Sequence, residues 1–230
     1  MSWRVIVTIG ASRTINRLPQ FTLRRPPAVG KHLGHPRGVL GHLAGRMMVR
    51  GNESLNEWLV DQLAERNEWD GSRIVEVGFG PGLGLANLLA AFPSARVWGI
   101  DHSAVMVQQA RFRNIAAVRS GRLTLRRGDV NWVGDIAPID LVVVVNVLYF
   151  WSDPHLELQK IRRAIGPGGA VCVGYHLRRH MSEETREALG ANGHRFFDTD
   201  GEVETLLRNA GFRDVQVMRR GPLRMQLAYA

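Results

Sequence analysis

A glycine-rich stretch that follows a carboxylate is the part of this sequence best suited to chemistry. Residues 76–82 read Glu-Val-Gly-Phe-Gly-Pro-Gly. Glycines let the backbone turn tightly and approach a ligand so closely that a side chain would clash. The apolar residues Ile74, Val75 and Val77 predict a buried parallel strand before the loop, and residues 83–92 predict a helix after it. The loop should therefore open onto a helix N-terminus with unpaired N–H groups, which suits a nucleotide-type cofactor.

The spacing of the glycines argues against a dinucleotide. A dinucleotide fingerprint has glycine at its first, third and sixth positions. Counting from Gly78, the sixth position is Leu83, so the pattern fails. The carboxylate of Glu76, two residues before the first glycine, would repel a pyrophosphate but attract a ligand that carries an ammonium and a sulfonium.

The acidic-x-Gly-x-Gly-x-Gly turn at residues 76–82 resembles the motif of the class I S-adenosylmethionine-dependent methyltransferases. Residues 101–106, Asp-His-Ser-Ala-Val-Met, are similar to the corresponding stretch of the ubiquinone/menaquinone-type enzymes of that family. The resemblance covers about residues 52–230 and implies S-adenosylmethionine as cofactor and a small molecule as methyl acceptor. The residues that it places at the cofactor are Glu76, Gly78, Phe79, Gly80, Gly82, Asp101, His102, Met106, Asp129, Val130 and Asn146.

Two acidic residues beyond the loop support an adenosine-type ligand. Asp101 ends the second predicted strand, 23 residues after Gly78, and a carboxylate there can accept both hydroxyl hydrogens of a ribose. Nicotinamide enzymes place an acid similarly, so Asp101 does not separate the two classes. In the resembled family, the position of Asp129 lies beside the adenine, where the acid accepts from the exocyclic amine.

The acceptor should bind where the fourth and fifth predicted strands end, because ligands of open α/β sheets lie at the carboxyl edge. The fourth strand, residues 139–145, is followed by Asn146 and three aromatic residues, and the fifth, residues 170–175, delivers His176. A histidine titrates near pH ~6.5 and can accept a proton from a hydroxyl or ammonium group. A hydrogen-bonded structural histidine is the alternative. The predicted catalytic residues are His176 and Tyr149, and the predicted substrate residues are Tyr149, Phe150, Trp151 and His176.

Strands alternate with helices along residues 52–230, and this pattern predicts a doubly wound α/β fold. The resemblance implies a single Rossmann-like sheet of seven strands, mostly parallel with the last antiparallel, and helices on both faces. Strands are expected at residues 73–77, 96–100, 123–126, 139–145, 170–175, 215–219 and 224–228. Helices are expected at residues 52–67, 83–92, 104–112, 154–165 and 202–210.

The positive charge of the chain is concentrated at one end. The formal net charge is +9, yet residues 1–50 carry nine basic and no acidic residues, which leaves 21 basic and 21 acidic residues in the other 180. We expect residues 1–37 to form a basic, poorly ordered arm; a transit peptide or added upstream sequence are alternatives. Residues 38–230 should form the methyltransferase domain, with a lid helix at about 38–50 and the core at 52–230.

Several other classes are disfavoured. The single cysteine, Cys172, excludes an internal disulfide and fits a reducing compartment. No zinc-type spacing of histidine and cysteine is present, and no apolar run approaches the ~20 residues of a membrane span. We expect a cytoplasmic protein without a metal that acts on an aromatic or lipophilic small molecule.

Three alternatives stay open. One is a Rossmann-type NAD(P)-dependent oxidoreductase that tolerates Leu83, and another is a cofactor-binding protein without activity. The third is a nucleic-acid methyltransferase that uses the basic arm. Residues 146–149, Asn-Val-Leu-Tyr, match only the ends of the Asn/Asp-Pro-Pro-Tyr motif of such enzymes, and a neutral body lacks the basic face that phosphate binding needs.

Overall fold

The structure is a computed structural model that describes residues 53–230. The basic arm expected at residues 1–37 and the lid helix expected at residues 38–50 lie outside the described residues. The first described element is a helix over residues 53–64, which we call the first helix.

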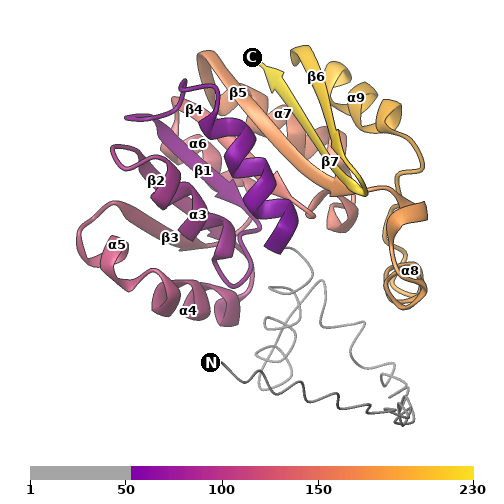
Figure 1. Ribbon diagram of the computed structural model, residues 1–230, viewed down its shortest axis with the longest axis horizontal. Helices are drawn as coiled ribbons and strands as arrows, with labels where there is room; N and C mark the ends of the chain where they lie inside the picture. Colours follow the sequence, from indigo (N-terminus) through magenta and orange to yellow (C-terminus); the bar gives the residue numbers. More distant parts are fainter. Residues whose placement is uncertain (1–52) are drawn as a thin grey trace, which may run out of the picture.

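Within residues 53–230, seven strands form one sheet (Figure 1). The strands are β1 (Arg73–Val77), β2 (Arg96–Asp101), β3 (Leu123–Arg127), β4 (Ile139–Val145), β5 (Ile165–His176), β6 (Arg213–Arg220) and β7 (Leu223–Tyr229). Their order is β3-β2-β1-β4-β5-β7-β6. Neighbours from β3 to β5 are parallel, whereas β7 is antiparallel to both β5 and β6. The Rossmann-like seven-stranded fold is confirmed. The strand order reverses between the parallel strands β1 and β4, and sheets of this kind bind ligands at such a switch point.

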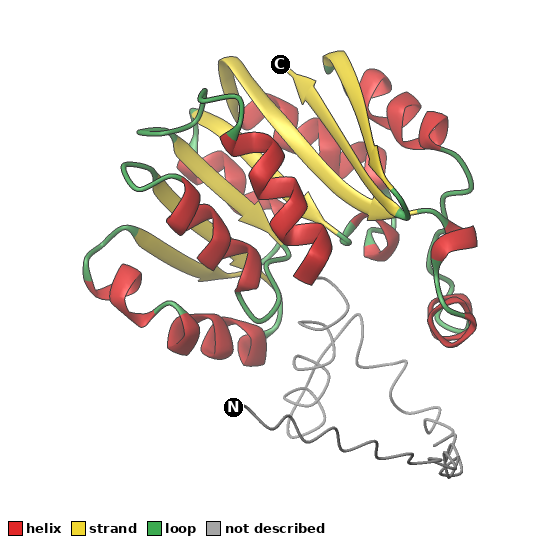
Figure 2. Ribbon diagram, in the orientation of Figure 1, coloured by secondary structure: helices red, strands yellow, loops and turns green. Residues whose placement is uncertain are grey.

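Helices cover both faces of the sheet (Figure 2). They are α3 (Leu83–Ala91), α4 (Ala104–Arg113), α5 (Ile115–Arg119), α6 (Val133–Ile136), α7 (Pro154–Ala164), α8 (Glu183–Gly190) and α9 (Asp200–Asn209), with short 3-10 helices η1 (Val130–Trp132), η2 (Leu148–Phe150) and η3 (Arg178–His180). The first helix, α3 and α4 pack on one face, and α6, α7 and α9 pack on the other. In Figure 1, α8 lies apart from both layers.

Side chains fix where several helices begin. The hydroxyl of Ser103 accepts from the Met106 N–H at the start of α4, as expected for an N-cap. Asp153 caps α7 and Pro154 follows at its first position, where proline is common. A capping box of Thr199 and Glu202 starts α9.

Several segments differ from the sequence-based expectation. β5 begins at Ile165, although helix was expected up to that residue and strand only from residue 170. Pairing explains the difference, because Ile165 lies opposite Ile139 of β4 and the carbonyl of Gly169 accepts from the N–H of Ala230. Helices α5, α6 and α8 were not expected at all.

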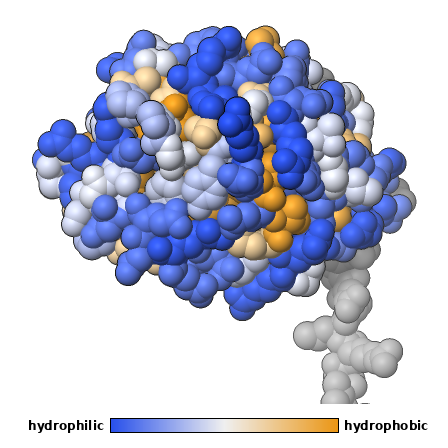
Figure 3. Space-filling view, turned by 90° about the horizontal axis from the view of Figure 1, so that it is seen from above, coloured by the Kyte–Doolittle hydropathy of each residue, from blue (hydrophilic) through white to orange (hydrophobic). Residues whose placement is uncertain are grey.

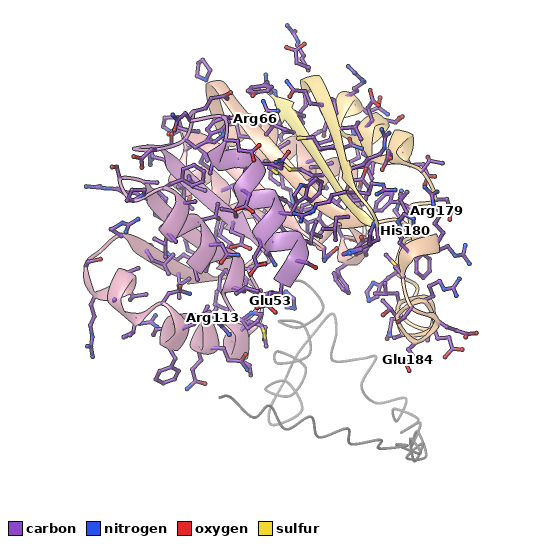
Figure 4. All side chains as sticks on the ribbon, viewed as in Figure 1. Glu53, Arg66, Arg113, Arg179, His180 and Glu184 are labelled. Carbon is purple, nitrogen blue, oxygen red and sulfur yellow. The ribbon has the colours of Figure 1, made fainter. Side chains whose placement is uncertain are left out.

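The first helix lies close to β5 and to α3 because a glycine in each of them makes room for it. A Cβ at Gly174 would lie 2.8 Å from Leu59, and a Cβ at Gly84 would lie 2.9 Å from the amide oxygen of Asn56. Figure 4 shows Glu53 at the lower end of this helix and Arg66 at the upper end. The start of the first helix therefore lies beside the glycine loop, at the carboxyl edge of the parallel strands.

Seen from above the view of Figure 1, the surface is mainly hydrophilic with one apolar strip (Figure 3). No helix among residues 53–230 has the length and apolar character needed to span a bilayer. Among these residues, no group of three or more His, Cys, Asp or Glu side chains is placed so that it could hold a metal ion.

Candidate active site

The glycine loop takes a backbone path that side chains would block. Gly78, Gly80 and Gly82 have φ values of 72°, 54° and 82°, in the left-handed region that favours glycine. A Cβ at Gly78 would also clash with the side chain of Val147. The carbonyl of Gly82 accepts from the Asn114 amide at 3.0 Å, which ties the loop to the end of α4. The loop thus leads from the end of β1 to α3 and passes close to Val147 at the exit of β4.

Asp101 holds this loop in place. One carboxylate oxygen accepts from the N–H of Gly80 at 2.9 Å, and the other accepts from the N–H of Ser103 at 2.8 Å. The side chain is only 6% exposed. Each carboxylate oxygen has a second lone pair, so Asp101 can accept a further hydrogen bond from a ligand hydroxyl. His102 is exposed beside it, with Nδ1 3.9 Å from the carboxylate.

Glu76 is a buried carboxylate with an unsatisfied oxygen. It is 3% exposed, and its Oε2 has no hydrogen-bond partner among the described residues. Burial, and then the nearby charge of Asp101, raise the pKa of Glu76 to about 8. Burial also raises the pKa of Asp101, against the opposing effect of its two backbone hydrogen bonds. Two buried carboxyl groups next to a glycine loop fit a cationic ligand, such as one with an ammonium and a sulfonium.

The other residues expected at the cofactor divide into two groups. Asp129 is exposed, and its carboxylate accepts from the N–H of Asn131 at 2.9 Å, so it caps η1 at the carboxyl edge. In contrast, the side chains of Phe79, Met106 and Val130 are 4%, 1% and 2% exposed and pack in the hydrophobic core. These three support the elements around the site, and their side chains do not face an open surface.

Asn146 lies at the acceptor side of the edge and contacts His176. It follows the last residue of β4 with φ at 55°, a left-handed conformation that asparagine tolerates. Its side-chain oxygen is 3.2 Å from Nδ1 of His176. Asn146 precedes Val147, which contacts the glycine loop, so the loop and His176 lie on either side of the β4 exit.

Tyr149 contacts the backbone of His176. Its hydroxyl accepts from the N–H of His176 at 2.5 Å and donates to the carbonyl of His176 at 2.9 Å. Burial raises the pKa of Tyr149, an effect that the hydrogen bond with the backbone of His176 opposes only in part. The hydroxyl therefore keeps its proton, and its position favours a role in holding His176 over a role as a base.

His176 is half-buried at the end of β5. Burial lowers the pKa of its imidazole, and the charges of His180 and Arg224 lower it further. The imidazole is consequently neutral at neutral pH, which is the state that can accept a proton.

Aromatic side chains gather around Tyr149 and Phe150 of η2. The ring of Phe150 meets the ring of His194 edge-on at 4.9 Å, and Tyr149 lies 5.9 Å from Phe197. The N–H of Arg195 donates to the carbonyl of Tyr149 at 3.3 Å, so the segment before α9 is attached to η2. Sequence reasoning missed His194 and Phe197, because the segment between β5 and α9 has no periodic pattern and its residues reach the site only through the fold. Trp151, the third expected aromatic residue, is half-buried next to them.

Comparison with known proteins identifies the family. A family model described as a methyltransferase domain matches residues 48–217. The chain belongs to this family. The methyltransferase is 29% identical over 177 residues to the uncharacterized methyltransferase YdaC of Bacillus subtilis, a match that covers 76% of this chain and 88% of the relative. It is 35% identical over 106 residues to the trans-aconitate 2-methyltransferase of Rhodopseudomonas palustris, covering 45% of this chain and 38% of the relative.

Solved structures agree on the fold. A putative O-methyltransferase from Nostoc punctiforme superposes with a TM-score of 0.65 at 19% identity, covering 82% of this chain and 61% of that one. The methyltransferase thus spans less than two thirds of this structural relative. The expected class I methyltransferase fold is confirmed, and the nicotinamide and nucleic-acid alternatives are not favoured. Membership of the ubiquinone/menaquinone type stays a prediction.

Proposed function

We propose that the methyltransferase transfers a methyl group from S-adenosylmethionine to a small-molecule acceptor by in-line displacement. When bound, S-adenosylmethionine supplies a methyl group that its sulfonium has already activated. The observation that carries the proposal is the unsatisfied oxygen of Glu76, buried next to a second carboxyl group at the glycine loop. In this proposal Glu76 binds the ammonium, Asp101 the ribose and Asp129 the adenine amine.

The acceptor side supports an aromatic or lipophilic substrate that carries a removable proton. The half-buried rings of Phe150, Trp151 and His194 offer apolar contact beside the neutral imidazole of His176. The protein's task is to align acceptor and methyl group and to exclude water. His176 accepts the proton as the acceptor atom forms its new bond.

A carboxylate acceptor is the second candidate, and the trans-aconitate relatives favour it. A carboxylate is already ionised at neutral pH, so its methylation needs no base. The two candidates therefore differ in what they require of His176.

Binding is tested first, by titration calorimetry of the full chain with S-adenosylhomocysteine and with NADH. We expect S-adenosylhomocysteine to bind and NADH not to bind; the reverse result would overturn the proposal.

Methyl transfer is tested with labelled S-adenosylmethionine and four acceptors: catechol, 4-hydroxybenzoate, benzylamine and trans-aconitate. With a phenol or amine as acceptor, His176→Ala should lower turnover by roughly 10²–10⁴-fold and remove the acidic limb of the pH profile. With trans-aconitate, the same variant should stay within about threefold of wild type. Loss of turnover with an unchanged pH profile would contradict the assignment of His176 as base.

A further inference from the structure

The strand that carries His176 extends beyond its neighbour. The β4–β5 pairing ends at Val145 opposite Gly174, whereas β5 continues to His176, which pairs with Leu223 of β7. Because β4 ends at Val145, it offers no residue that pairs with the backbone of His176. The hydroxyl of Tyr149 replaces that strand, because it bonds both the N–H and the carbonyl of His176. The backbone of His176 is therefore fixed from both sides.

Asn146 fixes the imidazole in turn. Its N–H donates to the carbonyl of Gly174 at 2.8 Å, and its left-handed backbone directs the side-chain oxygen to Nδ1 of His176 at 3.2 Å. An amide oxygen only accepts hydrogen bonds, so this contact favours the tautomer that has the hydrogen on Nδ1. In a neutral imidazole this leaves the lone pair on Nε2.

The other ring nitrogen is free to react. Within residues 53–230, Nε2 of His176 has no hydrogen-bond partner, and it is not among the buried polar atoms. It lies on the opposite side of the ring from Asn146. In histidines that transfer protons, a neighbouring acceptor orients one ring nitrogen and the other ring nitrogen takes the proton. Asn146 and His176 have this arrangement.

We propose that Asn146 is a positioning residue, which holds His176 in the tautomer whose Nε2 takes the proton of the methyl acceptor. The inference rests on the proposed function. As the acceptor atom bonds to the methyl carbon, the S–CH₃ bond breaks and its electron pair stays on sulfur. The proton of the acceptor's O–H or N–H group passes to Nε2, and the imidazolium later releases it to water. This role differs from the cofactor contact that the sequence predicted for Asn146.

The left-handed backbone of Asn146 suggests two matched variants. Asn146→Gly removes the amide but retains a residue for which φ at 55° is unstrained. Asn146→Asp tolerates the same conformation and keeps an oxygen facing Nδ1. Differences between the two variants then report the side-chain contact and not a change of backbone.

The test is nitrogen-15 NMR of the full-length protein with labelled histidine and bound S-adenosylhomocysteine, with His176 assigned from a His176→Gln variant. The wild type should show hydrogen on Nδ1 and a lone pair on Nε2. Asn146→Asp should keep this tautomer and raise the imidazole pKa, because a carboxylate replaces the amide. Asn146→Gly should shift the neutral ring toward hydrogen on Nε2.

Hydrogen on Nε2 in the wild type would overturn the inference without any variant. An unchanged tautomer in Asn146→Gly would overturn it as well. Calorimetry with S-adenosylhomocysteine separates this failure from that of the proposed function: tight binding with the opposite tautomer refutes only the role of Asn146, whereas absence of binding to the wild type refutes the methyltransferase proposal itself.

Discussion

Replacing the buried carboxylate of Glu76 by an amide should make the ligand-free methyltransferase more stable and weaken its binding of the cofactor. The ordinary pKa of this glutamate is 4.5, and the fold raises it to about 8. Between these values the folded protein holds a proton that the unfolded chain has released, so stability falls as the pH rises from 4.5 to 8. Above pH 8 the full cost of the buried charge remains. Glu76→Gln has the same shape and no charge to bury.

The size of the effect follows from the pKa difference. A shift from 4.5 to about 8, at 1.36 kcal/mol for each pKa unit, gives a ceiling of ~5 kcal/mol above pH 8. Relaxation and water entry reduce such desolvation costs. For a domain of this size, each kcal/mol changes the melting temperature by about 2–4 °C. The variant should therefore melt several degrees above wild type at pH 8.5 and close to it at pH 4.5.

Cofactor binding should change in the opposite direction. Loss of a charge-assisted hydrogen bond costs ~1.5–3 kcal/mol, which is roughly a 10- to 150-fold loss of affinity for S-adenosylhomocysteine. The wild-type affinity should rise with pH up to about pH 8, as Glu76 loses its proton, and the variant should lose this dependence.

The assays are thermal melting at pH 4.5 and 8.5 and calorimetry at both pH values. Glu57→Gln, on an exposed position of the first helix, controls for the change in net charge. Unchanged affinity at pH 8.5 would refute the assignment of Glu76 to the ammonium of the cofactor. An unchanged melting temperature at pH 8.5 would refute its raised pKa.

Gly78→Ala should abolish binding of S-adenosylhomocysteine in calorimetry, because φ at 72° strains any side chain and a Cβ there clashes with Val147; wild-type affinity would contradict the close approach of the loop to β4. Asp200→Asn should lower the melting temperature more at pH 7 than at pH 3, because the carboxylate accepts from Tyr175 at 2.8 Å and from Arg219 at 2.7 Å and must be ionised to hold the cation. Equal losses at the two pH values would show that charge plays no part.

The alternation of strands and helices was sufficient for the fold class, because local signals and tertiary structure agree, and the family resemblance implied the seven-stranded sheet. The aliphatic run of β4 can only be a central strand, and its bounds, Ile139–Val145, are those expected. The side chains of Ser103 and Asp153 define helix starts by bonds to residues three positions away, so sequence spacing reveals them. β5 starts earlier than expected because its first residue is held by a partner strand, which is a non-local interaction.

The site was predictable where a motif sets the backbone and not where contacts depend on the fold. Gly78 and Gly82 have positive φ values, and glycine is the residue type that adopts them without strain. The pairing of Asn146 with His176 depends on β4 and β5 ending at the same edge in register. His194 reaches Phe150 through a segment without periodic pattern, so no local signal was available.

The N–H groups of Gly80 and Ser103, which both donate to the carboxylate of Asp101, should affect the rate of cofactor binding. Because Gly80 and Ser103 are tied to one side chain before any ligand arrives, the loop is held in one conformation. Such preorganisation reduces the conformational entropy that association must remove. Cofactor association should then be a single fast step, and the amide hydrogens of Gly80 and Ser103 should exchange slowly with solvent even in the ligand-free protein.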